Sequence, residues 1–428
     1  MILLLSLYLL ILPIQFALSP IAGIDLALSR VLALTIIGSW AALCLARRSL
    51  ILPRPSLLLP LASFLAIASA SYFWSENRDW ALRKIIFLWN FFPLLIVFIA
   101  ALKEPRARRL ITRAITLSGA IAGTIGIAQS AAQFIWGVER VFAFWTGTLL
   151  PFFLGGTLGE SVASYPSLLV NISGATVLRA SALFPDPHML SLFLGLALPI
   201  AAGYALSQPK GSRALPIAAA IIILIADLLT FSRGGYVGLA AGTIALLVFS
   251  LSGKISRETL TRTLIGIAAI IALSLSLLMT PVGTRFISSF SSDDGSNSER
   301  LRLWQEAAEH IINHPVLGTG LGNYPLAVKP TADYREPIYA HSLYLDIAAE
   351  TGLPGLLTFL GIIAVALASA STAWVRHRDA ASAAATIALI IFSAHSLFEL
   401  PLFSVQVLPL FLAVLALAVD KNRDSKLL

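Results

Sequence analysis

The stretch IIFLWNFFPLLIVFIAAL, residues 85–102, carries no charged side chain and a single amide, Asn90. A helix needs roughly 20 predominantly apolar residues to cross the hydrocarbon core of a bilayer. A run of this length therefore predicts a membrane-spanning helix, and it determines how the rest of the chain is interpreted.

The whole chain has the composition of a membrane protein. Of its 428 residues, 57% are hydrophobic and 12% are charged, and the mean hydropathy is +0.86. Soluble globular domains usually contain about 25% charged residues. The single cysteine, Cys44, excludes an internal disulfide and a multi-cysteine metal site. The net charge of +8 does not indicate nucleic-acid binding, because in a polytopic protein the distribution of Lys and Arg carries the information.

Similar apolar runs recur along the chain. We expect an all-α polytopic fold with about 12 transmembrane helices in a single integral membrane domain, 1–428. The first run lacks a basic region before it and a clear cleavage site after it, so it is interpreted as a retained helix and not as a signal peptide. The predicted helices cover 2–18, 28–46, 56–74, 85–102, 111–135, 186–206, 214–230, 234–252, 262–280, 343–373, 380–398 and 402–419.

The basic residues favour one side of the membrane. Successive helices place the loops on alternate sides, and eighteen of the 30 Lys and Arg fall in the short loops of one side. By the positive-inside rule that side is cytoplasmic, and so are both termini. These residues are Arg47, Arg48, Arg54, Lys103, Arg106, Arg108, Arg109, Arg113, Lys210, Arg213, Lys254, Arg257, Arg262, Arg376, Arg378, Lys421, Arg423 and Lys426.

The opposite, periplasmic side receives a short turn, 230–234, and two long loops, 136–185 and 281–342. Long connections are more often functional than short ones. In the second loop, ERLRLWQEAAEHII has apolar residues at helical spacing, which predicts an amphipathic helix that ends at HPVLGTGLGNYP. We expect the apolar stretch FAFWTGTLLPFFLGG of the first loop to lie along the membrane interface.

Four basic residues fall at the predicted periplasmic boundary: Arg179, Arg233, Arg300 and His341. Arg233 gives the strongest signal, because it occupies a very short turn between two helices and precedes two glycines. A guanidinium beside the free N–H groups of a helix start suits an anion such as a phosphate. The alternative is an arginine that reaches toward the lipid headgroups.

His341 opens the stretch AHSLYLDIAAETGLPG, residues 340–355. A histidine has an ordinary pKa near 6.5, which suits a general base at the mouth of a helix. A structural histidine at the interface is the alternative. Tyr344, on the first turn of the same helix, is included as a supporting residue of the site.

Two acids follow on that helix. Asp346 and Glu350 share one face at i, i+4. Acids at this depth should face the protein interior or a wet cavity, where they pair with an arginine or orient the histidine. Glu350 equally suits a structural role beside TGLPG, where the glycines and proline predict a break or kink.

Other patterns are weaker. Arg302 either supports the site beside Arg300 or belongs to a solvated helix face. The stretch GTGLGNYP has no strand before it and no Lys-Ser/Thr after it, so it does not indicate a phosphate loop. His310 and His314 lack a third ligand for zinc. No metal and no other cofactor is expected.

The ordered motifs resemble a known family. LRASALFPDPHMLSLFLGLALPIA, LLTFSRGGYVGLAAG, SERLRLWQEAAEHIINHPVLGTGLGNY and HSLYLDIAAETGLPGLLTFL, taken in this order, are similar to the O-antigen ligase and polymerase superfamily of bacterial membrane proteins. The motifs cover residues 175–360, and the helix count extends the resemblance to the whole chain.

The resemblance implies a function. Members transfer a glycan from an undecaprenyl-diphosphate carrier at the periplasmic side of the inner membrane, without a metal or a nucleotide sugar. It implies that His341 is the essential histidine, that Arg233 and Arg300 contact the diphosphate, and that Arg179 is a further basic residue of the site. The chain departs from the family at His188 and Ser342, where the family commonly has Asn.

We therefore expect an inverting glycosyltransferase in which arginines stabilise the departing diphosphate and His341 removes the proton of the acceptor hydroxyl. Ligation of O-antigen to the lipid A core is the favoured reaction. A polymerase of O-antigen, capsule or exopolysaccharide repeats is the main alternative. A 12-helix transporter is less favoured, because the polar residues gather at one face and no halves repeat. A structural scaffold would leave the basic cluster unexplained.

Overall fold

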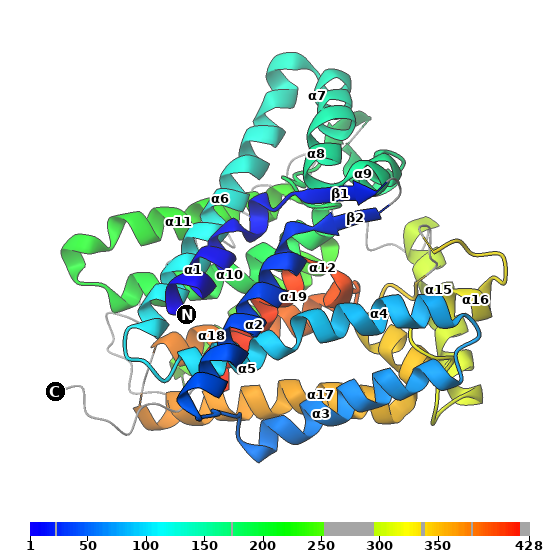
Figure 1. Cartoon of the computed structure of the whole chain (residues 1–428). Coiled ribbons are helices and arrows are strands. Elements are labelled where there is room, and N and C mark those ends of the chain that lie inside the picture. Colours follow the sequence, from blue (N-terminus) through cyan, green and yellow to red (C-terminus); the bar gives the residue numbers. More distant parts are fainter. Residues whose placement is uncertain (22–23, 173, 252–294, 335–338, 378–379, 420–428) are drawn as a thin grey trace.

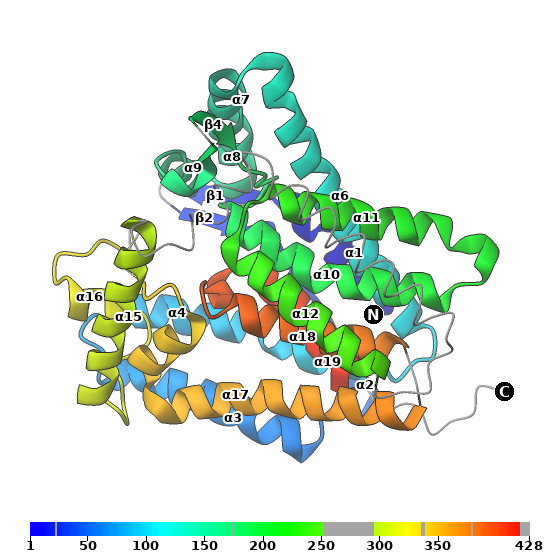
Figure 2. The same cartoon turned by 180° about the vertical axis from the view of Figure 1, so that it is seen from behind.

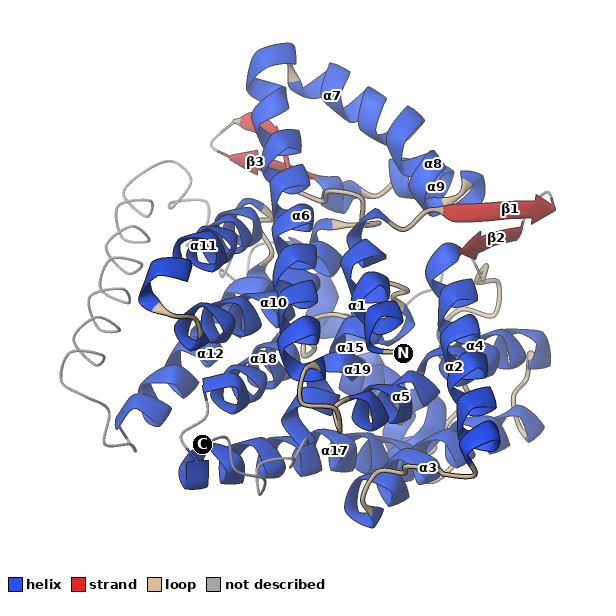
Figure 3. Ribbon diagram, turned by 60° about the vertical axis from the view of Figure 1, so that its left-hand side comes forward, coloured by secondary structure: helices blue, strands red, loops and turns tan. Residues whose placement is uncertain are grey.

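The computed structural model describes residues 1–21, 24–172, 174–251, 295–334, 339–377 and 380–419. This part of the chain is mostly helical and contains few strands (Figure 3). The predicted helix 262–280 lies outside the described residues.

The N-terminal elements follow the predicted apolar runs, with two corrections. The predicted helix 2–18 ends early, because Pro13 cannot donate a helical hydrogen bond. The predicted run 85–102 belongs to a longer span that is interrupted at Phe92, immediately before Pro93. The elements are α1 Ile2–Ile11, a 3₁₀ turn Leu12–Ile14, β1 Ala17–Ile21, β2 Ile24–Ala27, α2 Leu28–Arg47, α3 Pro55–Ala70, α4 Arg78–Phe91, α5 Pro93–Ala101 and α6 Ala107–Trp136.

The remaining long helices also match the apolar runs. The longest helix contains the predicted kink, at Gly352 with φ 70°. The last two predicted runs, 380–398 and 402–419, are each shorter as helices, and the residues between them form a turn around Glu399. The elements are α10 Pro187–Ser207, α11 Ala214–Leu229, α12 Arg233–Leu251, α17 Leu343–His377, α18 Ala380–His395 and α19 Val407–Val419.

Six described helical segments are long and apolar enough to cross a membrane. They cover Leu28–Arg47, Pro55–Phe73, Arg78–Ala101, Ala107–Trp136, Pro187–Ser207 and Leu343–Val375. Shorter apolar helices complete the bundle, at Ile2–Ile14, Ala214–Leu229, Arg233–Phe249, Ala380–His395 and Val407–Val419. The prediction of a helical, membrane-embedded protein is confirmed, whereas the number of about 12 spans and the placement of both termini in the cytoplasm stay predictions.

The bundle is built around α19, in which every residue from Val407 to Ala418 is buried. A helix that is apolar all round packs in the interior, since it has no face suited to water. α10 packs against α6, α11 and α18, and α17 packs along α3 (Figures 1 and 2). The ends of α10 and α17 that carry short connections both lie on the left of Figure 1.

The two long loops contain further structure, which the expectation of an all-α fold missed in part. The first holds α7 Val138–Phe144, a π-helical turn Trp145–Leu149, α8 Leu150–Leu154, α9 Gly156–Ala163, and the antiparallel pair β3 Leu169–Ile172 and β4 Ala175–Leu178. The second holds the predicted amphipathic helix as α15 Gly295–Asn313, followed by α16 Tyr324–Val328. α15 and α16 lie beside the first residues of α4 and α17 (Figure 1).

Candidate functional site

His341 lies in a constrained turn immediately before α17. Its φ is 49°, a left-handed value that is uncommon for any residue except glycine, and its side chain is exposed. Such a conformation costs of order 1–3 kcal/mol and persists only where the surroundings impose it. The imidazole is therefore presented to solvent by a backbone that other groups must hold.

Asp346 is one of those groups. Its Oδ1 accepts a hydrogen bond from the N–H of Ala340 at 3.0 Å, and its Oδ2 accepts one from the N–H of Ser342 at 3.4 Å. The two donors flank His341. Of the roles left open by the sequence, the geometry favours orientation of the histidine for Asp346.

A second clamp ties the same turn to the end of α18. The N–H of Leu343 donates to the carbonyl oxygens of Ser396 at 2.9 Å and Glu399 at 3.1 Å. The hydroxyl of Tyr344 donates to the carbonyl of Ser393 at 2.8 Å. The start of α17 and the turn after α18 therefore form one unit.

Glu399, in the turn after α18, contacts a basic residue and a histidine from two other helices. Its Oε1 lies 3.4 Å from Nη2 of Arg300, on α15, and 3.4 Å from Nδ1 of His188, on α10. Burial raises the pKa of Glu399 to about 8, although Arg300 lowers it. At neutral pH this carboxyl group is therefore largely protonated.

A chain of short polar contacts continues from His188 to the start of α12. Nδ1 of His188 lies 3.0 Å from Oγ of Ser232, and that oxygen lies 3.3 Å from Nε2 of His395. Asp186 caps α10 by accepting from the N–H groups of His188 and Met189. Three helices, α10, α12 and α18, thus meet at the residue that precedes Arg233.

The two glycines after Arg233 allow this close approach. A Cβ on Gly234 would lie 2.6 Å from Cδ2 of His395, and one on Gly235 would overlap Oγ of Ser191. Any larger residue would force α12 away from α18 and α10. The glycines therefore allow the close packing of α12 against α10 and α18. The sequence had suggested only that they expose backbone N–H groups to an anion.

Arg179 holds the turn before Arg233 from outside α12. Its Nε donates to the carbonyl of Thr230 at 2.7 Å, and Nη2 donates to that of Phe231 at 3.1 Å. Nη1 donates to the carbonyl of Ser167 at 2.8 Å. Burial lowers the pKa of Arg179 to about 10, so it remains charged at neutral pH. Its guanidinium is directed at backbone carbonyl oxygens. This geometry favours a role for Arg179 in positioning the turn that precedes Arg233.

His341 lies close enough to Arg300 for their charges to interact. Although its side chain reaches solvent, the surrounding protein desolvates the imidazole and lowers its pKa. Arg300 lowers this pKa further, and Glu299 raises it. The imidazole is therefore neutral at pH 7 and has a lone pair available for a proton.

Two other predicted residues lie apart from this cluster. Nη1 of Arg302 pairs with Oε1 of Glu306 at 2.6 Å on the exposed face of α15. This contact favours the alternative in which Arg302 belongs to a solvated helix face. Glu350 is buried and pairs with Nζ of Lys84, on α4, at 3.0 Å. The carbonyl of Glu350 also accepts from the N–H of Gly320. The structural role is thus favoured for Glu350.

In a comparison with family models, residues 218–360 match the model described as O-antigen ligase. The predicted resemblance to the O-antigen ligase superfamily is confirmed over these residues. A comparison with curated proteins found no match.

The match to the O-antigen ligase family indicates an enzyme of ligase or polymerase type that acts on lipid-linked glycans. The matched segment contains Arg233, Arg300 and His341. Glu399 and His188, which complete the polar cluster, lie outside it. The whole arrangement therefore depends on residues beyond the segment that defines the match.

Sequence reasoning missed Glu399, His395 and Lys84. A signal for two of them is present, because AHSLF, residues 394–398, nearly repeats AHSLY, residues 340–344. In the structure the two copies contact each other where the N–H of Leu343 donates to the carbonyl of Ser396. Lys84 has no comparable signal, since it precedes a long apolar run and resembles a residue at a membrane boundary.

The cluster can bind an anion and accept a proton. Among the described residues, no group of three or more His, Cys, Asp or Glu side chains could hold a metal ion. Arg300 is only partly buried and belongs to a helix outside the bundle, so it can reach a ligand without separating packed helices. The site thus combines cationic groups with an exposed neutral imidazole.

Proposed function

We propose that the protein transfers a glycan from undecaprenyl diphosphate to a sugar hydroxyl, and that the acceptor is the lipid A core. The observation that carries the proposal is the convergence of the His341 turn, Arg300 and the start of α12 around Glu399 and His188. These groups lie on or beside five helices distant in sequence, α10, α12, α15, α17 and α18. The match to the O-antigen ligase family supports lipid-linked glycans as substrates.

The proposed reaction is a single displacement. His341 takes the proton of the acceptor hydroxyl, whose oxygen bonds to C1 of the donor sugar as the bond from C1 to the diphosphate oxygen breaks. The electron pair of that bond leaves with the diphosphate, where Arg233 and Arg300 stabilise the added charge. Attack opposite to the leaving group inverts the configuration at C1.

The other predicted residues support these groups in the proposal. Arg179 positions the turn that precedes Arg233, and Asp346 positions His341. Tyr344 and Ser342 belong to the clamped turn. Removing one contact to the developing charge is expected to lower kcat by about 10²–10³, by analogy with loss of one oxyanion-hole donor.

The test uses purified protein, an undecaprenyl-diphosphate glycan and a lipid A core acceptor. The wild-type chain should form a product of inverted anomeric configuration, while His341→Ala and Arg233→Ala should fold and insert normally but give no transfer. A product of retained configuration, a trapped glycosyl-enzyme, or near-normal transfer by either variant would contradict the mechanism.

A deletion strain separates ligase from polymerase. Loss of a ligase should leave glycan chains of normal length on the carrier lipid and none on lipid A. Shortened chains on lipid A would instead identify a polymerase. Localisation to the inner membrane, with the site facing the periplasm, is part of the same proposal and can be checked by cysteine labelling at exposed positions of α15.

A further inference from the structure

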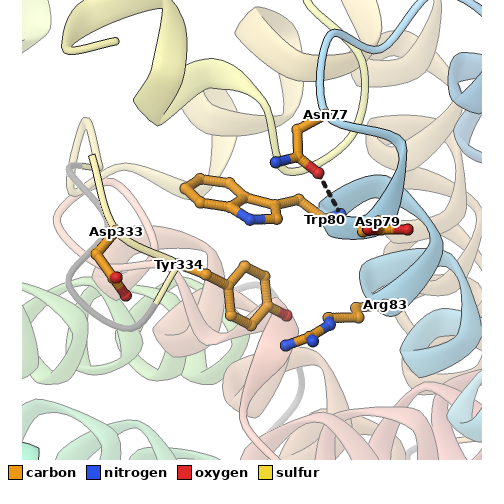
Figure 4. Close-up of a pocket in the computed structure, with 6 residues that line it drawn as sticks. All are labelled: Asn77, Asp79, Trp80, Arg83, Asp333 and Tyr334. Atoms are coloured by element: carbon orange, nitrogen blue, oxygen red, sulfur yellow. Dashed lines mark hydrogen bonds between the residues drawn. The ribbon is translucent and has the colours of Figure 1, made fainter. Parts of the chain in front are cut away.

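A cavity at the start of α4 stands apart from the cationic cluster. It encloses about 310 Å³, within the usual size range of ligand pockets. A neighbouring hollow of about 450 Å³ shares Asn77 and Asp79 with it and extends it toward α16. The first cavity is lined by Asn77, Asp79, Trp80, Arg83, Asp333 and Tyr334 (Figure 4).

An aromatic pair forms the centre of the cavity. The rings of Trp80 and Tyr334 meet edge to face, with centroids 5.3 Å apart, and the guanidinium of Arg83 lies 5.0 Å from the Tyr334 ring. The carboxylates of Asp79 and Asp333 lie on opposite sides of the rings (Figure 4). Flat apolar surfaces are therefore bordered by planar polar groups.

The base of the cavity is rigid. Oδ1 of Asn77 accepts from the N–H of Trp80 at 3.2 Å, which caps α4. The N–H of Asn77 donates to Oδ1 of Asn323 at 2.6 Å, and Nδ2 of Asn323 donates back to the carbonyl of Asn77. The turn is thus fixed to the segment before α16, and little ordering is needed when a ligand binds.

This combination suits a sugar. A pyranose ring presents C–H groups on its faces and hydroxyls around its edge, so aromatic rings and carboxylates recognise it together. Two carboxylates and one guanidinium line the cavity and supply acceptors and donors for hydroxyl groups. The cavity therefore differs in chemistry from the cationic cluster around Arg300 and suits uncharged sugars.

The loop that carries His341 connects the two regions. Lys84, next to Arg83 on α4, places Nζ 5.3 Å from the ring of Tyr339. Two residues after His341, Leu343 is clamped to the turn around Glu399. His341 therefore lies between an anchor on the cavity side and an anchor on the cationic side.

Chain geometry limits how far the cavity can be from the imidazole. His341 is seven positions after Tyr334, and a fully extended chain spans at most about 25 Å over seven positions. An oligosaccharide held at the cavity can therefore extend a terminal hydroxyl toward His341.

We propose that this cavity binds the acceptor glycan through uncharged sugars of the lipid A core oligosaccharide. The proposal rests on the proposed function for the identity of the acceptor. It assigns the donor diphosphate and the acceptor sugars to two separate sites on the two sides of the His341 turn.

The test compares three proteins in kinetic and binding assays. The double variant Trp80→Ala/Tyr334→Ala should raise the acceptor KM on the order of tenfold, with little change in kcat or in the donor KM. The matched control is Trp89→Ala, an exposed tryptophan of the same helix outside the cavity. Asp333→Asn, at an exposed position, should also raise the acceptor KM, and it serves as the second variant if the double variant is unstable.

Calorimetry measures binding of the glycan directly and does not require transfer activity. Core oligosaccharide released from lipid A should bind the wild-type and Trp89→Ala proteins and lose affinity for the double variant. Equal binding by all three proteins, or an unchanged acceptor KM in the double variant, would overturn the proposal.

A second probe addresses the source of the glycan. Stronger binding of the free O-antigen repeat, without phosphate, would overturn the assignment to the acceptor in favour of the donor glycan. If the wild-type protein shows no transfer, the proposed function fails, while the calorimetric result still decides whether the cavity binds this glycan.

Discussion

The turn that carries His341 can be tested by replacing Asp346 with asparagine. The change keeps the size of the side chain but replaces one carboxylate oxygen with an NH₂ group. One of the two N–H groups, that of Ala340 or of Ser342, then faces a donor instead of an acceptor. Both residues are buried, so water cannot easily replace the lost bond.

The size of the effect follows from that single unsatisfied donor. A buried N–H without a partner costs about 1–3 kcal/mol. The native turn already includes an unfavourable φ at His341, so the penalty should fall on this turn before it affects the bundle. If the full cost reduces the population of the native turn, kcat should fall roughly 5- to 150-fold.

The assay measures kcat, the donor KM and the thermal unfolding midpoint in detergent. We expect kcat to fall and the donor KM to change little, because the cationic residues are held by other elements. Thr358→Val, on the same helix, removes a hydroxyl that donates to the carbonyls of Pro354 and Gly355 and should leave kcat unchanged. A normal kcat in Asp346→Asn, or an equal loss in the Thr358 control, would refute the positioning role.

Three further changes test the charges around the site. Glu299→Gln removes a neighbour that raises the pKa of His341, so the acid limb of kcat/KM should move to lower pH; a shift to higher pH would contradict the assignment. Glu399 ionises near pH 8 and then competes with the diphosphate for the arginine it contacts, so the donor KM should rise above that pH and Glu399→Gln should abolish the rise. Lys84→Met leaves Glu350 buried without its partner, which should lower the free energy of unfolding by about 3–5 kcal/mol, whereas the double variant Lys84→Met/Glu350→Gln should recover part of the loss.

The sequence predicted the features that depend on local order. Apolar runs located the long helices, since burial in lipid or protein requires continuous hydrophobicity. The kink at Gly352 followed from the Gly and Pro residues around it. The short hairpins β1–β2 and β3–β4 were missed, because short apolar segments have no periodicity that separates strand from helix.

The contacts that assemble the site were not predictable in the same way. Arg300 and Glu399 lie 99 residues apart in sequence, and Lys84 and Glu350 lie 266 apart. Hydrophobic periodicity fixes which face of a helix is buried but not which distant helix covers it. For this reason Arg179 was predicted from its charge alone, whereas its direction, toward the carbonyls of Thr230 and Phe231, required the fold.

Above pH 8, where it is ionised, Glu399 offsets part of the positive charge of the site without a substrate. Several positive charges close together in a protein interior repel one another, and each loses hydration. A carboxyl group whose pKa is about 8 can adjust its charge to that of its surroundings. Above pH 8 and without a donor, its ionised form is stabilised by Arg300, 3.4 Å away. With a diphosphate bound, the added negative charge raises the pKa of Glu399 further, so the group takes up a proton and releases Arg300 to the phosphate. We infer that above pH 8 this carboxylate substitutes for the phosphate in the empty site, and that donor binding in that pH range therefore consumes protons.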